Sequence, residues 1–151
     1  PSMMLMEHNA TDRYWKYGLG PEYRVPLYEL VYHDATVTSW RWNDNSHKQP
    51  ATWARKDLFN ALYATAPQWN LDGPTWTRLR DRFVSSYQAL TKVLRDVGYS
   101  EMLDHRFLDE ARQLQETRFA NGSSVIVNFS PTPVEAAGQT VPAESFVLIQ
   151  P

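Results

Sequence analysis

The sequence predicts an α/β fold that is followed by β structure toward the C-terminus. The apolar run of residues 25–32, rich in β-branched, aromatic and aliphatic side chains, has the length of one buried strand. Apolar residues then recur at helical spacing over residues 51–63 and 75–97. Short strand patterns separated by Gly and Pro occupy the last third of the chain. This order, α/β first and then β, sets the expectations for each element.

Composition narrows the class of protein. The net charge of -2 offers no cationic surface for a phosphate backbone, so we expect no nucleic-acid partner. The absence of cysteine rules out disulfides and Cys-ligated zinc, and we expect neither metal nor cofactor. No apolar run approaches the roughly 20 residues that span a bilayer, so we expect no membrane partner. Six Trp and eight Tyr are a hint of carbohydrate binding.

The N-terminal third is expected to alternate strand, loop and helix. Residues 3–6 form a short strand at most, and residues 43–49 read as a polar loop. Pro50 suits the first turn of the helix predicted over residues 51–63. The chain begins with Pro1 and lacks a signal-like segment, so we expect a piece of a longer protein. A secreted or periplasmic location is favoured over a cytoplasmic one.

The middle of the chain contains the clearest helical pattern. Residues 64–74 resemble a short strand that ends in a loop at Asp72, Gly73 and Pro74. Pro74 also suits the first turn of the helix predicted over residues 75–97, and Gly98 suits a left-handed stop beyond its end.

The C-terminal region is expected to be all β after a mixed segment at residues 99–112 that receives no assignment. Residues 113–119 and 146–149 read as strands, and Asn121-Gly122 is a strong hairpin signal. Such strands form half a sandwich at best. We therefore expect two domains, residues 1–104 and residues 105–151.

A candidate ligand site follows the apolar run. In α/β folds ligands gather where strands end at their carboxyl edge. Indole faces stack on pyranose rings, and acids, amides and imidazoles bond hydroxyl groups, so the ligand class that fits is a sugar. The candidate substrate-binding residues are His33, Asp34, Trp40, Trp42, Asp44 and Trp69.

Each candidate also has a structural interpretation. His33 and Asp34 could be a structural pair, and the indoles could pack between loop and barrel. Glu29 inside the apolar run is expected to pair with an arginine, Arg24, Arg41 or Arg55, because a buried carboxylate needs a partner. His105, with Asp104 and Glu101, fits a hydrogen-bond cluster between domains better than a metal site.

Four stretches carry a family resemblance: VPLYELVYHD, LFNALYATAPQWNL, GYSEMLDHRFL and TRFANGSSVIVNF. They resemble the C-terminal part of a glycoside hydrolase related to the endo-alpha-N-acetylgalactosaminidases and alpha-N-acetylgalactosaminidases. The resemblance implies the last strands and helices of a (β/α)8-type barrel plus part of a β-sandwich domain. It also implies cleavage of α-linked sugars, amino sugars above all, by two carboxylates that lie upstream, so that the catalytic residues are unknown here.

Two other functions remain open from the sequence. A non-catalytic carbohydrate-binding module would suit the aromatic content and the β-rich end, although the long helix of residues 75–97 argues against it. A purely structural domain would use the same Trp residues in its core. The expected partners are a carbohydrate and, in a longer chain, the rest of the barrel.

Overall fold

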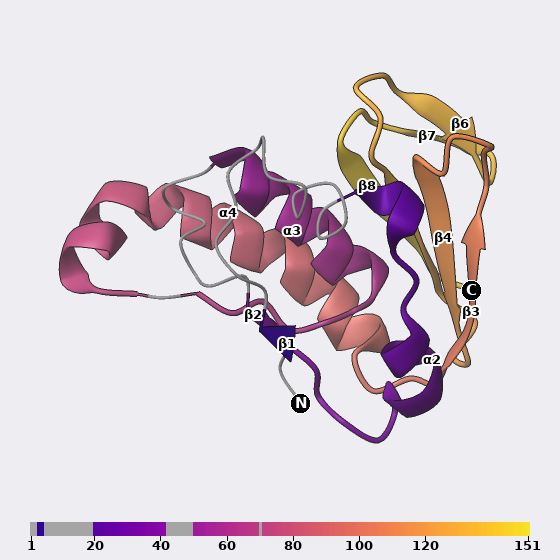
Figure 1. Cartoon of the computed structure of the whole chain (residues 1–151), viewed down its shortest axis with the longest axis horizontal. Coiled ribbons are helices and arrows are strands. Elements are labelled where there is room, and N and C mark those ends of the chain that lie inside the picture. The colour runs from indigo at the N-terminus through magenta and orange to yellow at the C-terminus, as the bar shows by residue number, and fades with distance from the viewer. Residues whose placement is uncertain (1–2, 5–19, 42–49, 70) are drawn as a thin grey trace.

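The protein is a mixed α and β structure in which two long helices lie beside an antiparallel sheet (Figure 1). The computed structural model describes residues 3–4, 20–41, 50–69 and 71–151. The predicted α/β character followed by β structure is confirmed in this coarse form. The N-terminal elements are β1 (Met3–Met4), the 3-10 turn η1 (Pro21–Tyr23), α2 (Leu27–Tyr32) and β2 (Trp40–Arg41).

The two predicted long helices are confirmed as α3 (Pro50–Leu62) and α4 (Gly73–Val97). An Asp72 carboxylate oxygen accepts a hydrogen bond from the Thr75 backbone N–H at 2.6 Å and caps the start of α4. The prediction for Gly98 was wrong in its backbone conformation, because its φ of -61° is right-handed. Glycine is needed there for space, since a Cβ would collide with the Leu94 carbonyl oxygen.

The C-terminal region is a four-stranded antiparallel sheet in the order β3-β4-β5-β8, with a separate hairpin of β6 and β7. The predicted Asn121-Gly122 hairpin is confirmed between β4 and β5, and Gly122 has the positive φ of 89° that such a turn requires. The bounds are β3 (Met102–Phe107), β4 (Leu114–Phe119), β5 (Ser124–Asn128), β6 (Val134–Ala136), β7 (Gln139–Val141) and β8 (Ser145–Ile149).

Strand alternation gives the sheet two apolar faces. Val125 and Val127 of β5 point to the helices and share a core with α3 and α4. Ile126, between them, faces the other side and packs with Val141 of the β6–β7 hairpin. The predicted division near residue 104 stays a prediction; β3 runs continuously across that position.

Residues 25–32 do not form the predicted buried strand. They contain α2, in which the N–H of Leu30 donates to the Pro26 carbonyl and that of His33 to the Glu29 carbonyl. Pro26, Glu29 and His33 are buried at helical spacing, whereas Leu27 and Val31 are exposed. Periodicity alone does not distinguish a strand from a helix in an apolar run this short. In the structure the buried residues Glu29 and His33 are four apart, which is the spacing of one helix face.

Parallel pairing occurs elsewhere in the N-terminal region. Met3–Met4 pairs in parallel with Trp40–Arg41, and Ser39 makes a parallel bridge with Ala66. Of the strand expected within residues 64–74, only Ala66 forms a β-bridge. The short strand expected from Met3 is confirmed over two residues, Met3–Met4. Residues 43–49, predicted as a loop, lie outside the described residues.

The two ends of α4 allow a matched test of the space around glycine. Gly98→Ala is expected to destabilise the protein by about 1–3 kcal/mol, because the new Cβ meets backbone that must shift. Gly73→Ala is expected to be neutral or to stabilise slightly, since no atom lies within 4 Å of the place that its new methyl group would take. Thermal unfolding of both variants measures this, and equal effects at the two positions would contradict it.

Candidate functional site

The parallel pairs define two distinguishable edges in the N-terminal region. Residues 36–38 and Ala64 precede the bridge between Ser39 and Ala66, so they lie at the amino edge. Residues 67–69 follow the bridge and leave from the carboxyl edge, the edge at which β2 ends at Arg41. In folds built on parallel strands, ligands bind at the carboxyl edge, so the two edges have different expected roles.

His33 lies at the amino edge and is 4% exposed. Its Nδ1 lies 2.7 Å from the Ser100 carbonyl oxygen, and its Nε2 lies 3.4 Å from the Ala64 carbonyl oxygen. A carbonyl can only accept, so Nδ1 carries a proton and donates to Ser100. The ring also packs against Phe119 of β4 at 5.4 Å between centroids. His33 therefore joins the end of α2, the end of α3 and the start of the sheet.

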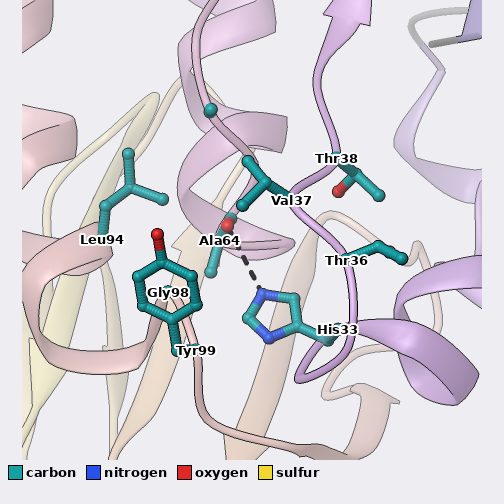
Figure 2. Close-up of a pocket in the computed structure, with 9 residues that line it drawn as sticks. His33, Thr36, Val37, Thr38, Ala64, Leu94, Gly98 and Tyr99 are labelled. Atoms are coloured by element: carbon teal, nitrogen blue, oxygen red, sulfur yellow. Dashed lines mark hydrogen bonds between the residues drawn. The ribbon is translucent and has the colours of Figure 1, made fainter. Parts of the chain in front are cut away.

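A cavity of about 140 Å³ lies beside this histidine. Figure 2 shows the His33 ring pointing to the Ala64 carbonyl, with Tyr99 across from the irregular segment that carries Thr36 and Thr38. Asp34, the other half of the predicted pair, is exposed and does not line the cavity. The cavity is small beside the 300–1,000 Å³ or so of ligand pockets in general.

The carboxyl edge is held by a buried lysine. Lys56 of α3 is 0% exposed, and its Nζ donates to the Gln68 carbonyl oxygen at 2.6 Å. The next residue, Trp69, packs edge-on against Phe83 of α4 at 5.7 Å between centroids. Trp69 Nε1 and Gln68 Oε1 are buried, and neither has a hydrogen-bond partner within the described ranges of the chain. A donor and an acceptor without partners therefore lie side by side in sequence at this edge.

Aromatic rings surround Phe83 behind this edge. Trp53 lies 4.6 Å and Trp76 lies 6.1 Å from the Phe83 ring, centroid to centroid. Trp53 and Phe83 are buried, whereas Trp76, in the first turn of α4, is 42% exposed. The cluster forms an aromatic support behind Trp69 with one indole open to solvent.

Two buried carboxylates are engaged within the fold. Asp57 of α3 accepts from Arg82 Nη2 at 2.7 Å and from Ser86 Oγ at 2.8 Å. Burial raises the pKa of Asp57, and the Arg82 charge and the Ser86 hydrogen bond oppose that rise. The negative charge of Glu29 raises the pKa of the nearby Arg24 guanidinium.

Arg24 illustrates how strongly this interior is desolvated. Burial lowers the pKa of Arg24 to about 10. Electrostatic interactions with Tyr63 and Glu29 and a side-chain hydrogen bond with Tyr63 oppose this shift. Its guanidinium lies 4.4 Å from the Phe59 ring centroid, and burial raises the pKa of Tyr63 well above its usual range. The charge of Glu29 favours the charged form of Arg24, one of the three arginines expected to pair with it; the ion pair itself stays a prediction.

The His105 ring of β3 packs edge-on against the Tyr63 ring, with 5.9 Å between their centroids. Its Nδ1 is 3.3 Å from Thr117 Oγ1, and Nε2 is buried without a partner in the described residues. Burial lowers the pKa of His105 to about 4. Asp104 pairs with Arg106 instead of with this histidine. Within the described residues no group of three His, Cys, Asp or Glu side chains could hold a metal ion.

Some of the other predicted contacts fall outside the described residues. Trp40 belongs to β2, but only its backbone is described, and Trp42 and Asp44 lie outside the described ranges. Sequence reasoning missed Lys56 and Gln68, because nothing in the pattern RKDLFN distinguishes a buried lysine from a solvated one. In the ranges that the structure describes, no helix has the length and apolarity to cross a membrane.

Comparison with protein-family models places this arrangement in a class. Residues 1–118 match the model for glycosyl hydrolases related to family GH101, family GH129. The sequence is thus related to the glycosyl hydrolases. Since the match includes 118 of 151 residues, the chain belongs to family GH129. The resemblance noted in the sequence is confirmed.

Solved structures show the same relationship at the level of the fold. The ligand-free alpha-N-acetylgalactosaminidase NagBb from Bifidobacterium bifidum is 23% identical with a TM-score of 0.53, covering 80% of this chain and 17% of that chain. A quadruple mutant of that enzyme is 22% identical with a TM-score of 0.52, covering 81% and 18%. The chain therefore spans less than a fifth of the length of these neighbours. A search of the curated proteins found no match.

The lowered pKa of His105 predicts an acid-sensitive contribution to stability. Between pH 6.5 and about 4 the unfolded chain binds a proton on this imidazole that the folded chain does not, so stability falls as pH falls. One proton corresponds to about 1.4 kcal/mol per pH unit at most. Denaturant unfolding across this window is expected to show a shallower loss for His105→Gln than for the wild type. Identical slopes would assign the acid sensitivity to other groups.

Proposed function

We propose that the chain forms the C-terminal part of the catalytic unit of a glycosidase that cleaves α-linked sugars, with N-acetylated amino sugars as the substrate class. It contributes substrate-binding residues, and the catalytic carboxylates come from a preceding part of a longer polypeptide. Membership of GH129 supports glycoside hydrolysis, and the name of the structural neighbour, an alpha-N-acetylgalactosaminidase, supports the sugar class.

The observation that carries the proposal is the alternation of parallel segments with helices. Met3–Met4, Trp40–Arg41 and Ala66 are linked by parallel pairing, α2 and α3 lie between them in sequence, and α4 follows. Parallel strands that alternate with helices are the repeating unit of a (β/α)8 barrel, whose active site lies at the carboxyl ends of its strands. This supports a barrel end, followed by part of a β-sandwich.

The described carboxylates support placing the catalytic pair upstream. Glycosidases need two carboxyl groups that flank the scissile bond, about 5–5.5 Å apart in retaining enzymes and about 6.5–9.5 Å apart in inverting ones. Asp57 is occupied by Arg82 and Ser86, and Glu29 faces Arg24 within the protein. Within the described ranges, these two buried carboxylates serve the fold.

The carboxyl edge is where we propose the substrate contacts. Trp69 follows Ala66, and the backbone of Trp40 forms part of β2, so chain order supports this edge for both. Trp42 and Asp44 lie outside the described residues and stay proposed contacts from the sequence. The buried Trp69 N–H without a described partner supports a donor role toward the sugar. His33 and Asp34, at the amino edge, are the alternative contact set.

A kinetic comparison in the full-length protein tests this proposal. The wild type is expected to hydrolyse p-nitrophenyl N-acetyl-α-galactosaminide, and Trp69→Phe to raise KM by about two- to tenfold, because one neutral hydrogen bond to the sugar is lost. Trp53→Phe makes the same change of ring at a buried indole bonded to Ser86, and is expected to leave KM unchanged. Steady-state kinetics measures all three.

Three results would contradict the proposal. An inactive wild type that still binds free N-acetylgalactosamine would indicate a non-catalytic carbohydrate-binding domain. Absence of both activity and binding would indicate a structural domain. A rise in KM on Asp34→Ala or His33→Ala, with none on Trp69→Phe, would place the substrate at the amino edge.

A further inference from the structure

Lys56 is the most completely buried cation that the structure describes. Its side chain is 0% exposed on α3, and transfer of an ammonium group from water into a protein interior is costly unless the group is hydrogen-bonded and paired. Among the interactions of Lys56, a hydrogen bond and a nearby opposite charge offset that cost. Nζ donates to the Gln68 carbonyl oxygen at 2.6 Å, and the adjacent Asp57 carboxylate attracts the charge. A lysine in this position is therefore engaged with the backbone of residue 68.

Asn60, one helical turn further along α3, forms hydrogen bonds to Thr65, at the start of the segment of residues 65–68. Its side-chain Oδ1 accepts from Thr65 Oγ1 at 3.0 Å, and its carbonyl oxygen accepts from the Thr65 N–H at 3.0 Å. Residues four apart lie on one face of a helix, so Lys56 and Asn60 present a buried polar face. Asn60 thus bonds Thr65 at one end of residues 65–68, and Lys56 bonds Gln68 at the other. Ala66, inside this segment, makes the parallel bridge to Ser39.

Two buried polar groups without partners lie at the end of this segment and directly after it. Gln68 Oε1 and Trp69 Nε1 are buried without a hydrogen-bond partner within the described residues. A buried polar group that stays unpaired destabilises the protein, because it has given up its hydrogen bonds to water. An amide oxygen and an indole N–H match the hydroxyl donors and acceptors of a sugar, and both lie just past the carboxyl end of a parallel segment.

We propose that Lys56 is a positioning residue: its bond to the Gln68 carbonyl sets residues 68–69 so that the Trp69 N–H and the Gln68 side-chain oxygen meet the sugar. This inference rests on the proposed function, because it requires that the carboxyl edge binds substrate. Lys56 itself does not touch the substrate and acts through the backbone of Gln68. It is absent from the contacts that the sequence predicted.

The test is a double-mutant cycle in the full-length protein with p-nitrophenyl N-acetyl-α-galactosaminide as the probe. Lys56→Met keeps the length of the side chain and removes the donor, and we expect KM to rise about five- to tenfold while kcat changes little. In a Trp69→Phe background the same substitution is expected to raise KM by a smaller factor, about two- to threefold, since the Trp69 contact is already lost and only that of Gln68 remains to be disturbed.

Arg82→Met is the matched control for stability. It removes a bond to Asp57 at 2.7 Å next to Lys56 without touching the Gln68 carbonyl, so we expect a lower Tm with an unchanged KM. If Lys56→Met does not give folded protein, Lys56→Gln is used in the same cycle: its amide keeps a polar group in the interior, but the shorter side chain draws the donor away from the Gln68 carbonyl oxygen, so a rise in KM is still expected.

Each outcome decides a separate claim. An unchanged KM in the Lys56 variants, or a KM effect that adds fully to that of Trp69→Phe, would overturn the positioning role while leaving the glycosidase activity intact. A parallel rise in KM on Arg82→Met would reduce the effect to general destabilisation and overturn it too. A wild type that does not hydrolyse the probe would overturn the proposed function and this inference together.

Discussion

The enclosure of helix α3 is the constraint on which the rest of the structure depends. Residues 56–65 are all buried, and the helix contacts α4, β4, β5 and β8. A helix enclosed in this way has little water to bond its polar side chains, so these form hydrogen bonds inside the protein, although Asn60 Nδ2 is buried without a partner among the described residues. Lys56 finds Gln68, Asp57 finds Arg82 and Ser86, and Asn60 finds Thr65. Those partners fix where the neighbouring segments lie.

The same enclosure connects the N-terminal region to the sheet. Arg24, from the turn that precedes α2, lies over the Phe59 ring, and Gln115 of β4 donates to the Pro21 carbonyl oxygen at 2.9 Å. His33 adds a bond to the Ser100 carbonyl, just before β3. These contacts fix the N-terminal segment against α3 and the sheet.

Sequence reasoning succeeded where one local pattern determines the structure. Apolar residues at spacings of three and four predicted α4, and Asn121-Gly122 predicted the β4–β5 turn, because each depends on neighbours in the chain. It failed for α2, where an apolar run is half exposed, and made no assignment for β3, whose residues do not alternate cleanly between buried and exposed. The same holds for the candidate site. Trp69 was a candidate from its residue type and its place in the sequence, whereas the role proposed for Lys56 depends on a contact with Gln68 that only the folded chain reveals.

The short passage from α4 to β3 has a consequence for how such enzymes are assembled and engineered. Only residues 98–101 separate the helix from the strand, Gly98 has no room for a side chain, and both elements contribute to one apolar core. A recombination point placed here would separate Leu90, Val93 and Val97 from Met102 and Phe119, and expose apolar surface on both products. The helices and the sheet are therefore expected to be inherited as one block, and viable chimaeras to have their crossover points elsewhere.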